Sequence, residues 1–316
     1  MDQVVDAART FFQHLAAVGW TALGVALAFH VARLVVRSLA WRNILAAAYP
    51  DLRVPRLGVF GAYAAGVGVN SIIPARAGDA LKLVLVRRQV EGSTYTTLTP
   101  TLFVETLFDM VVAAAILGWA LTQGLLPPLD VLPDLPSIDW NLPLHHPRPA
   151  IAIAGVWIAV IVLLVVVWKR RVGDFTQRVR QGVAILRTPG RYLRLVVLWQ
   201  ALSWVLRGAT IYFCLHAFHV HASVRNTLLV LAVQSLSTLL PFTPGGIGTQ
   251  QGLIVYVFRG AAVSRTALVS FSVGMQIATT VCNLVIGLAA MLAIARTVRW
   301  KQILAPEREE VERAQS

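Results

Sequence analysis

The chain has 316 residues, of which 57% are hydrophobic and only 14% are charged, and its mean hydropathy is +0.67. This composition excludes an ordinary soluble globular protein and predicts a membrane protein with several spans. The net charge of +13 does not indicate nucleic-acid binding, because the basic residues gather in short loops between apolar segments, where membrane orientation and anionic lipid account for them.

Five apolar segments are candidates for crossing a bilayer, which takes about 20 residues. Basic residues follow the first, third and fifth of them, so we expect these to end in the cytoplasm and the N-terminus to lie outside, with the C-terminus in the cytoplasm. The abundance of arginine and alanine indicates a bacterial protein, and we expect it in the inner membrane. The predicted spans cover residues 18–38, 97–122, 151–168, 193–215 and 266–295.

Two further apolar stretches are broken in the middle. Pro74 and Gly78 interrupt residues 57–90, while two prolines and three glycines interrupt residues 226–258. Proline and glycine end helices, and the resulting arms are too short to cross a hydrocarbon core of about 30 Å. We therefore predict two re-entrant helical hairpins, the first entering from the cytoplasm and the second from outside.

The order of elements is the same in the two halves of the chain. Residues 11–122 and 192–300 each contain a span, a hairpin and a second span, and the span at 151–168 reverses the second copy. A basic interfacial helix in the cytoplasm is expected at 174–188. The predicted fold is an all-α polytopic membrane protein, a single domain over 1–316 with about five full spans and two oppositely oriented hairpins in an inverted-topology repeat. The alternative is that two kinked membrane helices merely resemble each other.

Charged residues inside predicted spans are costly unless they are paired, hydrated or protonated. Glu105 and Asp109 are four residues apart and share one helix face, and Asp109 lies about 18 Å from the start of its span at 1.5 Å per residue. Arg207 lies about 20 Å into a span of the same direction, so we expect it to pair with one of the two carboxylates. The pair is either a structural ion pair or a gate or proton relay. Arg33 and Arg37 are interpreted as anchors at the cytoplasmic surface.

Candidate substrate-binding residues come from the two hairpin tips and from a polar stripe on the last span. Backbone N–H groups at the start of each second arm suit a phosphate or another anion. Asp79 is either a helix cap or the counter-ion of Arg76, and the stripe either lines a cavity or bonds to a neighbouring helix. The candidates are Asn70, Arg76, Gly78, Asp79, Gly245, Gly246, Gly248, Gln250, Gln251, Gln276, Thr280 and Asn283.

Three stretches resemble the transmembrane family of lysylphosphatidylglycerol synthase and flippase proteins. They are Asn70 to Asp79, Val104 to Asp109, and Pro241 to Gln251, which is similar to the family's Pro-x-x-Pro-Gly-Gly-x-Gly-x-x-Glu motif. The resemblance implies a stand-alone member without the aminoacyl-transfer domain, of a kind implicated in lipid transport. Thr106 and Gln251 depart from the family's usual arginine and glutamate, and the second departure removes one candidate proton site.

These observations predict a lipid flippase that moves an amphipathic lipid with a phosphate headgroup by alternating access to a polar cavity. No P-loop, nucleophile elbow or metal-ligand motif occurs, so neither ATP-driven transport nor enzymatic activity is expected, and no cofactor, metal ion or catalytic residue is predicted. Expected partners are the lipid substrate, anionic lipid at the cytoplasmic face and, as one option, further copies of the chain. The alternatives are an integral-membrane lipid-modifying enzyme that uses Glu105 and Asp109, or a non-catalytic subunit of an envelope complex.

Overall fold

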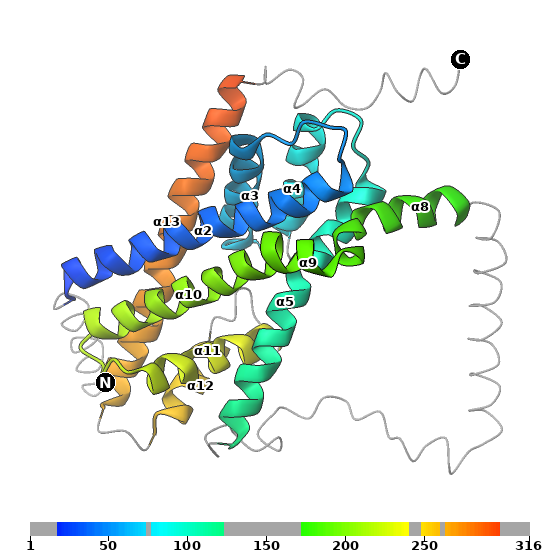
Figure 1. Cartoon of the computed structure of the whole chain (residues 1–316). Helices are drawn as coiled ribbons and strands as arrows, with labels where there is room; N and C mark the ends of the chain where they lie inside the picture. Colours follow the sequence, from blue (N-terminus) through cyan, green and yellow to red (C-terminus); the bar gives the residue numbers. More distant parts are fainter. Residues whose placement is uncertain (1–17, 74–76, 123–171, 240–247, 260–262, 298–316) are drawn as a thin grey trace, which may run out of the picture.

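The protein is described by a computed structural model over residues 18–73, 77–122, 172–239, 248–259 and 263–297, and every regular element in these ranges is helical (Figure 1). The elements are α2 (Trp20–Ala48), α3 (Arg56–Asn70), α4 (Ala77–Gln89), α5 (Tyr95–Thr122), α8 (Val172–Gly182), η2 (Ala184–Arg187), α9 (Pro189–Tyr192), η3 (Leu193–Val197), α10 (Leu198–Ala217), α11 (Val224–Leu239), α12 (Thr249–Val257) and α13 (Arg265–Thr297). Of these, η2 is a short 3₁₀ turn and η3 is a π turn, and both precede α10.

Four runs of helix in the described ranges are long and apolar enough to cross a membrane: α2, α5, the continuous run Pro189–Ala217, and α13. Three of them coincide with the spans predicted at 97–122, 193–215 and 266–295. The helix at the first predicted span is longer than the span, because α2 continues ten residues past residue 38 to Ala48. Arg37 is paired with carboxylates inside the protein and does not mark the end of the helix. The span predicted at 151–168 lies outside the described residues.

The two broken stretches each form a pair of short helices at the predicted places. The helices α3 and α4 have 15 and 13 residues, and α11 and α12 have 16 and 9. The tips between them, with Arg76, Gly245 and Gly246, lie outside the described residues. The predicted helix at 174–188 is present as α8 followed by η2. Re-entry of the pairs into a bilayer and a surface position of α8 stay predictions.

The first long helices of the two halves lie side by side and antiparallel (Figure 1). At one end the Gly19 N–H donates to the Ala217 carbonyl oxygen at 2.9 Å, and at the other the Asn43 amide donates to the Leu195 carbonyl oxygen at 2.8 Å. The last long helix of each half packs on the broken pair of the other half, α13 on α3 and α5 on α11. The two halves therefore use the same crosswise packing, as a repeat would; its inverted orientation in the membrane stays a prediction.

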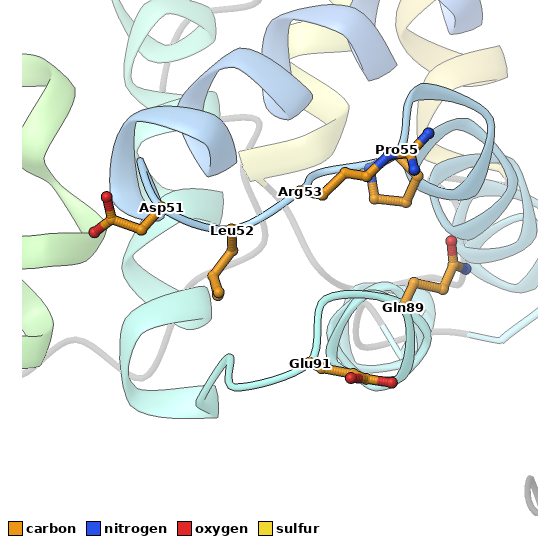
Figure 2. Close-up of a pocket in the computed structure, with 6 residues that line it drawn as sticks. All are labelled: Asp51, Leu52, Arg53, Pro55, Gln89 and Glu91. Atoms are coloured by element: carbon orange, nitrogen blue, oxygen red, sulfur yellow. The ribbon is translucent and has the colours of Figure 1, made fainter.

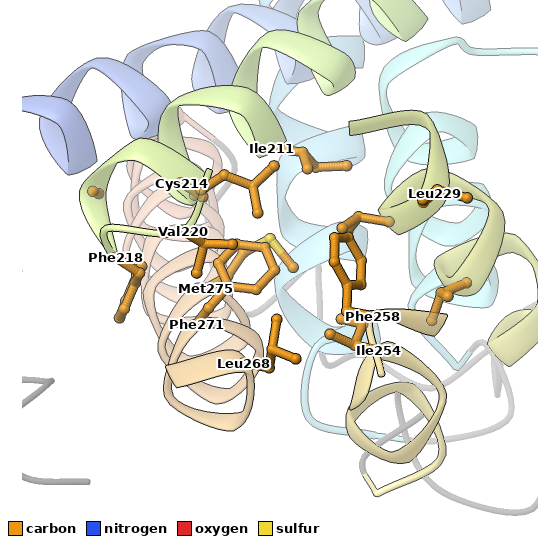
Figure 3. Close-up of a cluster of buried hydrophobic side chains, with 14 of the residues drawn as sticks. Ile211, Cys214, Phe218, Val220, Leu229, Ile254, Phe258, Leu268, Phe271 and Met275 are labelled. Carbon is orange, nitrogen blue, oxygen red and sulfur yellow. The ribbon is translucent and has the colours of Figure 1, made fainter. Parts of the chain in front are cut away.

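Two hydrophobic clusters hold the bundle together. In the first, side chains from α10, α11, α12 and α13 point toward one another, and the rings of Phe218 and Phe271 meet edge to face at 6.1 Å (Figure 3). The second surrounds Trp41 and joins α2 to α3, α4, α5 and the η2 turn. Members of both clusters, Leu34 and Tyr63 from one and Ile211 and Met275 from the other, also line a polar cavity.

The helices α3 and α13 approach each other closely at two glycines. A Cβ atom on Gly68 would lie 3.0 Å from the Asn283 carbonyl oxygen and 3.3 Å from the Cα of Gly287. A Cβ atom on Gly287 would lie 3.0 Å from the Ala64 carbonyl oxygen and 3.1 Å from the Cα of Gly68. Small residues permit such contact between membrane helices, where close packing replaces the hydrophobic effect as the source of association.

We expect Gly287→Leu to separate α3 from α13 and to destabilise the protein by about 1–3 kcal/mol, since an added side chain has no space in this contact. Equilibrium unfolding in mixed detergent micelles would measure the loss. Gly118→Leu is the matched control, because nothing lies within 4 Å of a Cβ atom built on Gly118. An equal loss in both variants would contradict the close contact.

Candidate functional site

A polar cavity of roughly 290 Å³ lies among the helices and is lined from α2, α3, α10, α11, α12 and α13. Both broken helix pairs and three of the long apolar helices therefore contribute residues to the lining of one cavity. Three of its lining side chains are basic, namely His30, Arg33 and Arg207, and no lining residue is acidic. The remaining polar lining consists of hydroxyl and amide groups, with one phenol. Such a cavity suits a solute that carries negative charge and hydrogen-bond acceptors.

Four of the predicted binding residues line this cavity: Gln250, Gln276, Thr280 and Asn283. One member of the polar stripe, Asn283, also bonds to residues of two other helices. Its side-chain nitrogen donates to the Ser71 hydroxyl at 3.0 Å, and its side-chain oxygen, Oδ1, lies 2.8 Å from Nε2 of His30. The stripe on α13 therefore combines the two roles that the sequence left open, since it lines a cavity and joins neighbouring helices.

Arg37 pairs with both membrane carboxylates, which corrects the sequence prediction. Its Nη2 lies 2.8 Å from Oε1 of Glu105 and 2.6 Å from Oδ2 of Asp109. The Arg37 side chain is 12% exposed and that of Glu105 only 3%, so Arg37 is not a surface anchor. The prediction of an Arg207 pair was wrong because matching depths along two helices do not determine which helix faces turn toward each other.

Two neutral donors bond to the carboxylates, and a third bonds to the backbone of Glu105. The Tyr63 hydroxyl donates to Oε1 of Glu105 at 3.0 Å, and the Gln200 amide donates to the Glu105 carbonyl oxygen at 3.0 Å. The Trp204 indole donates to Oδ1 of Asp109 at 2.8 Å. Residues from α2, α3, α5 and α10 thus meet at two side chains of α5. Hydrogen-bonded pairing of this kind is what offsets the cost of burying charge.

Among the described residues, Arg207 lines the cavity and contacts the ion cluster through Trp204. Its guanidinium donates to Oε1 of Gln234 at 2.8 and 3.3 Å, and it lies 4.9 Å from the ring centre of Trp204. The same Trp204 ring bonds to Asp109. One aromatic side chain therefore connects a carboxylate of the cluster with a cation of the cavity.

The predicted residues at the first hairpin bond to one another and not to the cavity. The Asn70 amide oxygen accepts the Gly78 N–H at 2.7 Å, and the Asn70 amide nitrogen donates to Asp79 at 3.1 Å. Asp79 forms an ion pair with Lys82 at 3.0 Å, and the Lys82 ammonium lies 4.3 Å from the centre of the Tyr63 ring. Lys82 is thus a counter-ion of Asp79 that the sequence did not indicate, and this group fastens α3 to α4.

At the second hairpin, Gln251 uses both ends of its amide. Its oxygen accepts the N–H of Gly248, which has a φ of +87°, at 2.6 Å, and its nitrogen donates to Gln276 at 2.7 Å. A glutamate carboxylate could accept the first bond but could not donate the second. Glutamine at this position therefore fits the contact between α12 and α13.

Sequence reasoning missed three lining residues, His30, Arg33 and Gln234. His30, Arg33 and Arg37 are three and four positions apart and share one face of α2. This spacing predicts a basic face in the interior once α2 is taken to continue to Ala48. Arg33 was interpreted as an anchor, yet its Nε is buried and has no hydrogen-bond partner among the described residues. A buried donor without a partner costs free energy, so the Arg33 guanidinium would gain from a hydrogen-bond acceptor in the cavity that it lines.

A second, open hollow of about 470 Å³ lies where α2 leads into α3 and α4 ends (Figure 2). Asp51, Arg53 and Glu91 line it together with Leu52, Pro55 and Gln89. These charged side chains are exposed, which is typical of a water-facing end of a bundle. In the part of the chain that the structure describes, no group of three or more His, Cys, Asp and Glu side chains is placed to hold a metal ion.

Residues 7–287 match the family described as the lysylphosphatidylglycerol synthase TM region. The chain belongs to this family. A UPF0104 membrane protein of Methanocaldococcus jannaschii is 22% identical over 201 residues, covering 60% of this chain and 79% of its own. Another UPF0104 membrane protein, from Methanothermobacter thermautotrophicus, is 29% identical over 89 residues, 28% of this chain and 25% of that protein. The comparison with solved structures finds no significant match. The membership confirms the family predicted from the three motifs.

We expect Arg37→Met to destabilise this family member by about 3–5 kcal/mol, because it leaves Glu105 and Asp109 buried without a counter-charge. Arg207→Met removes no ion pair in the described structure and should cost less. Unfolding in mixed micelles would compare the two. Adding Asp109→Asn to Arg37→Met should restore part of the loss, and a larger loss in Arg207→Met than in Arg37→Met would refute this assignment of the pair.

Proposed function

We propose that the protein is a lipid flippase, which moves an amphipathic lipid with a phosphate headgroup between the leaflets of the cytoplasmic membrane. The family is named for the membrane region of a lysylphosphatidylglycerol synthase, and a lipid-related membrane function is consistent with that membership. The observation that carries the proposal is the polar cavity, with its basic lining, among helices long enough to span a bilayer. A headgroup could cross there while the tails stay in the lipid.

The charge balance around the cavity supports an anionic headgroup. In the described interior, Arg33, Arg37, Arg207 and Lys82 are positive, while Glu105, Asp109 and Asp79 are negative. With His30 neutral, one positive charge is left without a counterpart. An isolated charge is costly in hydrocarbon, and the single negative charge of a phosphodiester would balance it. Arg33, with its unpartnered Nε, and Arg207 are the proposed ligands.

The proposed mechanism uses the two broken helix pairs as re-entrant hairpins of an inverted repeat, with the N-terminus outside and the C-terminus in the cytoplasm. Each hairpin contributes to the cavity wall and packs against the last long helix of the other half. Tilting of one half against the other would then expose the cavity to one side of the membrane at a time. Such movement needs no ATP and would be downhill or coupled to an ion gradient.

The proposed gate is the connection from Asp109 through Trp204 to Arg207. An anion bound at Arg207 would move the Trp204 ring, and this movement would change the strength of the hydrogen bond from the Trp204 indole to Asp109. This links the headgroup site to the ion cluster that joins α2 to α5. An enzymatic role for Glu105 and Asp109 has less support, because both already accept hydrogen bonds from Arg37.

The decisive test is transbilayer movement of fluorescent phosphatidylglycerol in liposomes, followed with a membrane-impermeant quencher. The wild-type protein should accelerate the movement, and Arg207→Gln should reduce it to the background of empty liposomes, because the headgroup loses a cation. Arg259→Gln, a change of an exposed arginine against Tyr256, is the matched control and should leave the rate unchanged. No acceleration by the wild-type protein across several lipids would refute the flippase proposal.

Asp109→Asn should slow lipid movement at normal expression and folding, because a neutral amide weakens the bond to Trp204 and the pair with Arg37. The same liposome assay measures the rate, and the yield of folded protein controls for stability. Unchanged transport would return Asp109 to a purely structural role.

A further inference from the structure

An apolar groove runs between α2 and α13, on the outside of the polar cavity. Its volume is about 630 Å³, and nearly all of its lining is hydrocarbon. From α2 it is lined by Trp20, Leu23, Leu27 and Val31, and Phe218, which follows α10, also lines it. From α13 it is lined by residues between Gly274 and Ile286. A groove of this character accepts an aliphatic chain and no polar group.

The groove follows α13 as far as Ile286. That residue also lines a second apolar pocket, of about 620 Å³, between α3 and the later part of α13. Together the two pockets follow α13 from Gly274 to Ile294, which is about 30 Å at 1.5 Å per residue. This length equals the hydrocarbon thickness of a bilayer, about 30 Å. A lipid chain could therefore lie along α13 at any depth in the membrane.

The same two helices line the groove and the cavity with adjacent faces. On α2, Leu27 and Val31 face the groove, while His30 and Leu34 face the cavity three positions later. On α13, Cys282 faces the groove and Asn283 the cavity. The groove and the cavity are thus separated only by the seam where α2 meets α13.

A hydrogen bond between side chains crosses this seam. Nε2 of His30 lies 2.8 Å from Oδ1 of Asn283, and the Asn283 amide continues to the Ser71 hydroxyl at 3.0 Å. A bond between two side chains can open at a cost of about 1–2 kcal/mol in membrane proteins. The contact is therefore suited to a latch that opens and recloses.

We propose that the seam between α2 and α13 is the lateral entrance for the lipid, with an acyl chain in the groove and the phosphodiester at Arg33 and Arg207. The His30–Asn283 bond is the latch, and the headgroup passes it while the chain stays in the groove. The inference rests on the proposed function and adds the route. The occupant is a lipid because the groove is apolar, faces outward from spanning helices and adjoins a basic cavity that requires a negative charge.

The test is photo-crosslinking from two exposed valines replaced one at a time by a benzoylphenylalanine residue. Val281 lies in the groove and is 52% exposed, whereas Val111 lies on α5 outside it and is 62% exposed. The protein is reconstituted in nanodiscs with equal amounts of phosphatidylglycerol and an uncharged glucosyl diacylglycerol. Mass spectrometry of the adducts should show phosphatidylglycerol enriched at position 281 relative to 111.

Adding Arg33→Gln and Arg207→Gln should abolish the enrichment at position 281, because the headgroup then has no cation to bind. Equal lipid ratios at the two positions, or an enrichment that survives both substitutions, would overturn the proposal. If liposomes show transport but the ratios are equal, the route is wrong and the flippase function stands. If enrichment occurs without transport in liposomes, the lipid site stands and the flippase function fails.

A second measurement tests the route through transport. Ala278→Trp fills the groove with an indole and should reduce lipid movement toward the liposome background. Ala115→Trp places the same ring on an exposed position of α5 and should leave the rate unchanged. Normal transport by a folded Ala278→Trp protein would overturn the proposal that the lipid enters between α2 and α13.

Discussion

The pairing of one arginine with two carboxylates in the middle of long apolar helices is the constraint on which the rest of the structure depends. Glu105 and Asp109 on α5 carry negative charge within an apolar helix, and Arg37 of α2 forms an ion pair with each of them. The supporting donors come from α3 and α10, so one cluster determines how four helices sit relative to one another. Without this cluster, the helices that line the cavity would lose a contact that they share.

The chemistry of the interior is divided between two groups of charges with different surroundings. The carboxylates accept hydrogen bonds from Arg37, Tyr63 and Trp204. Among the described residues, Arg33 instead has an unpartnered Nε, and Arg207 bonds to a neutral amide and lies against the Trp204 ring. An anion would therefore have an electrostatic reason to enter the cavity and none to disturb the cluster. The indole between Arg207 and Asp109 is where the two groups meet, which makes it the place where binding could be coupled to movement.

The contacts that α13 makes with α3 and with α2 differ in how closely the helices pack. Gly68 and Gly287 allow α3 and α13 to pack backbone against backbone. The seam between α2 and α13 instead has an apolar groove outside, a polar cavity inside and a side-chain hydrogen bond across it. A seam of this kind can open for an amphipathic molecule without breaking the tighter contacts beside it.

The sequence by itself determined the class of protein, the two broken helix pairs and the family, because hydrophobic length, proline, glycine and local motifs are encoded within single segments. It also identified Glu105, Asp109 and most of the polar stripe as unusual in a membrane. Only the tertiary structure decided that Arg37, and not Arg207, is their partner, and that His30, Arg33 and Gln234 face a cavity. Depth along a helix can be counted from the sequence, but the direction in which a side chain points across the bundle depends on how the helices pack.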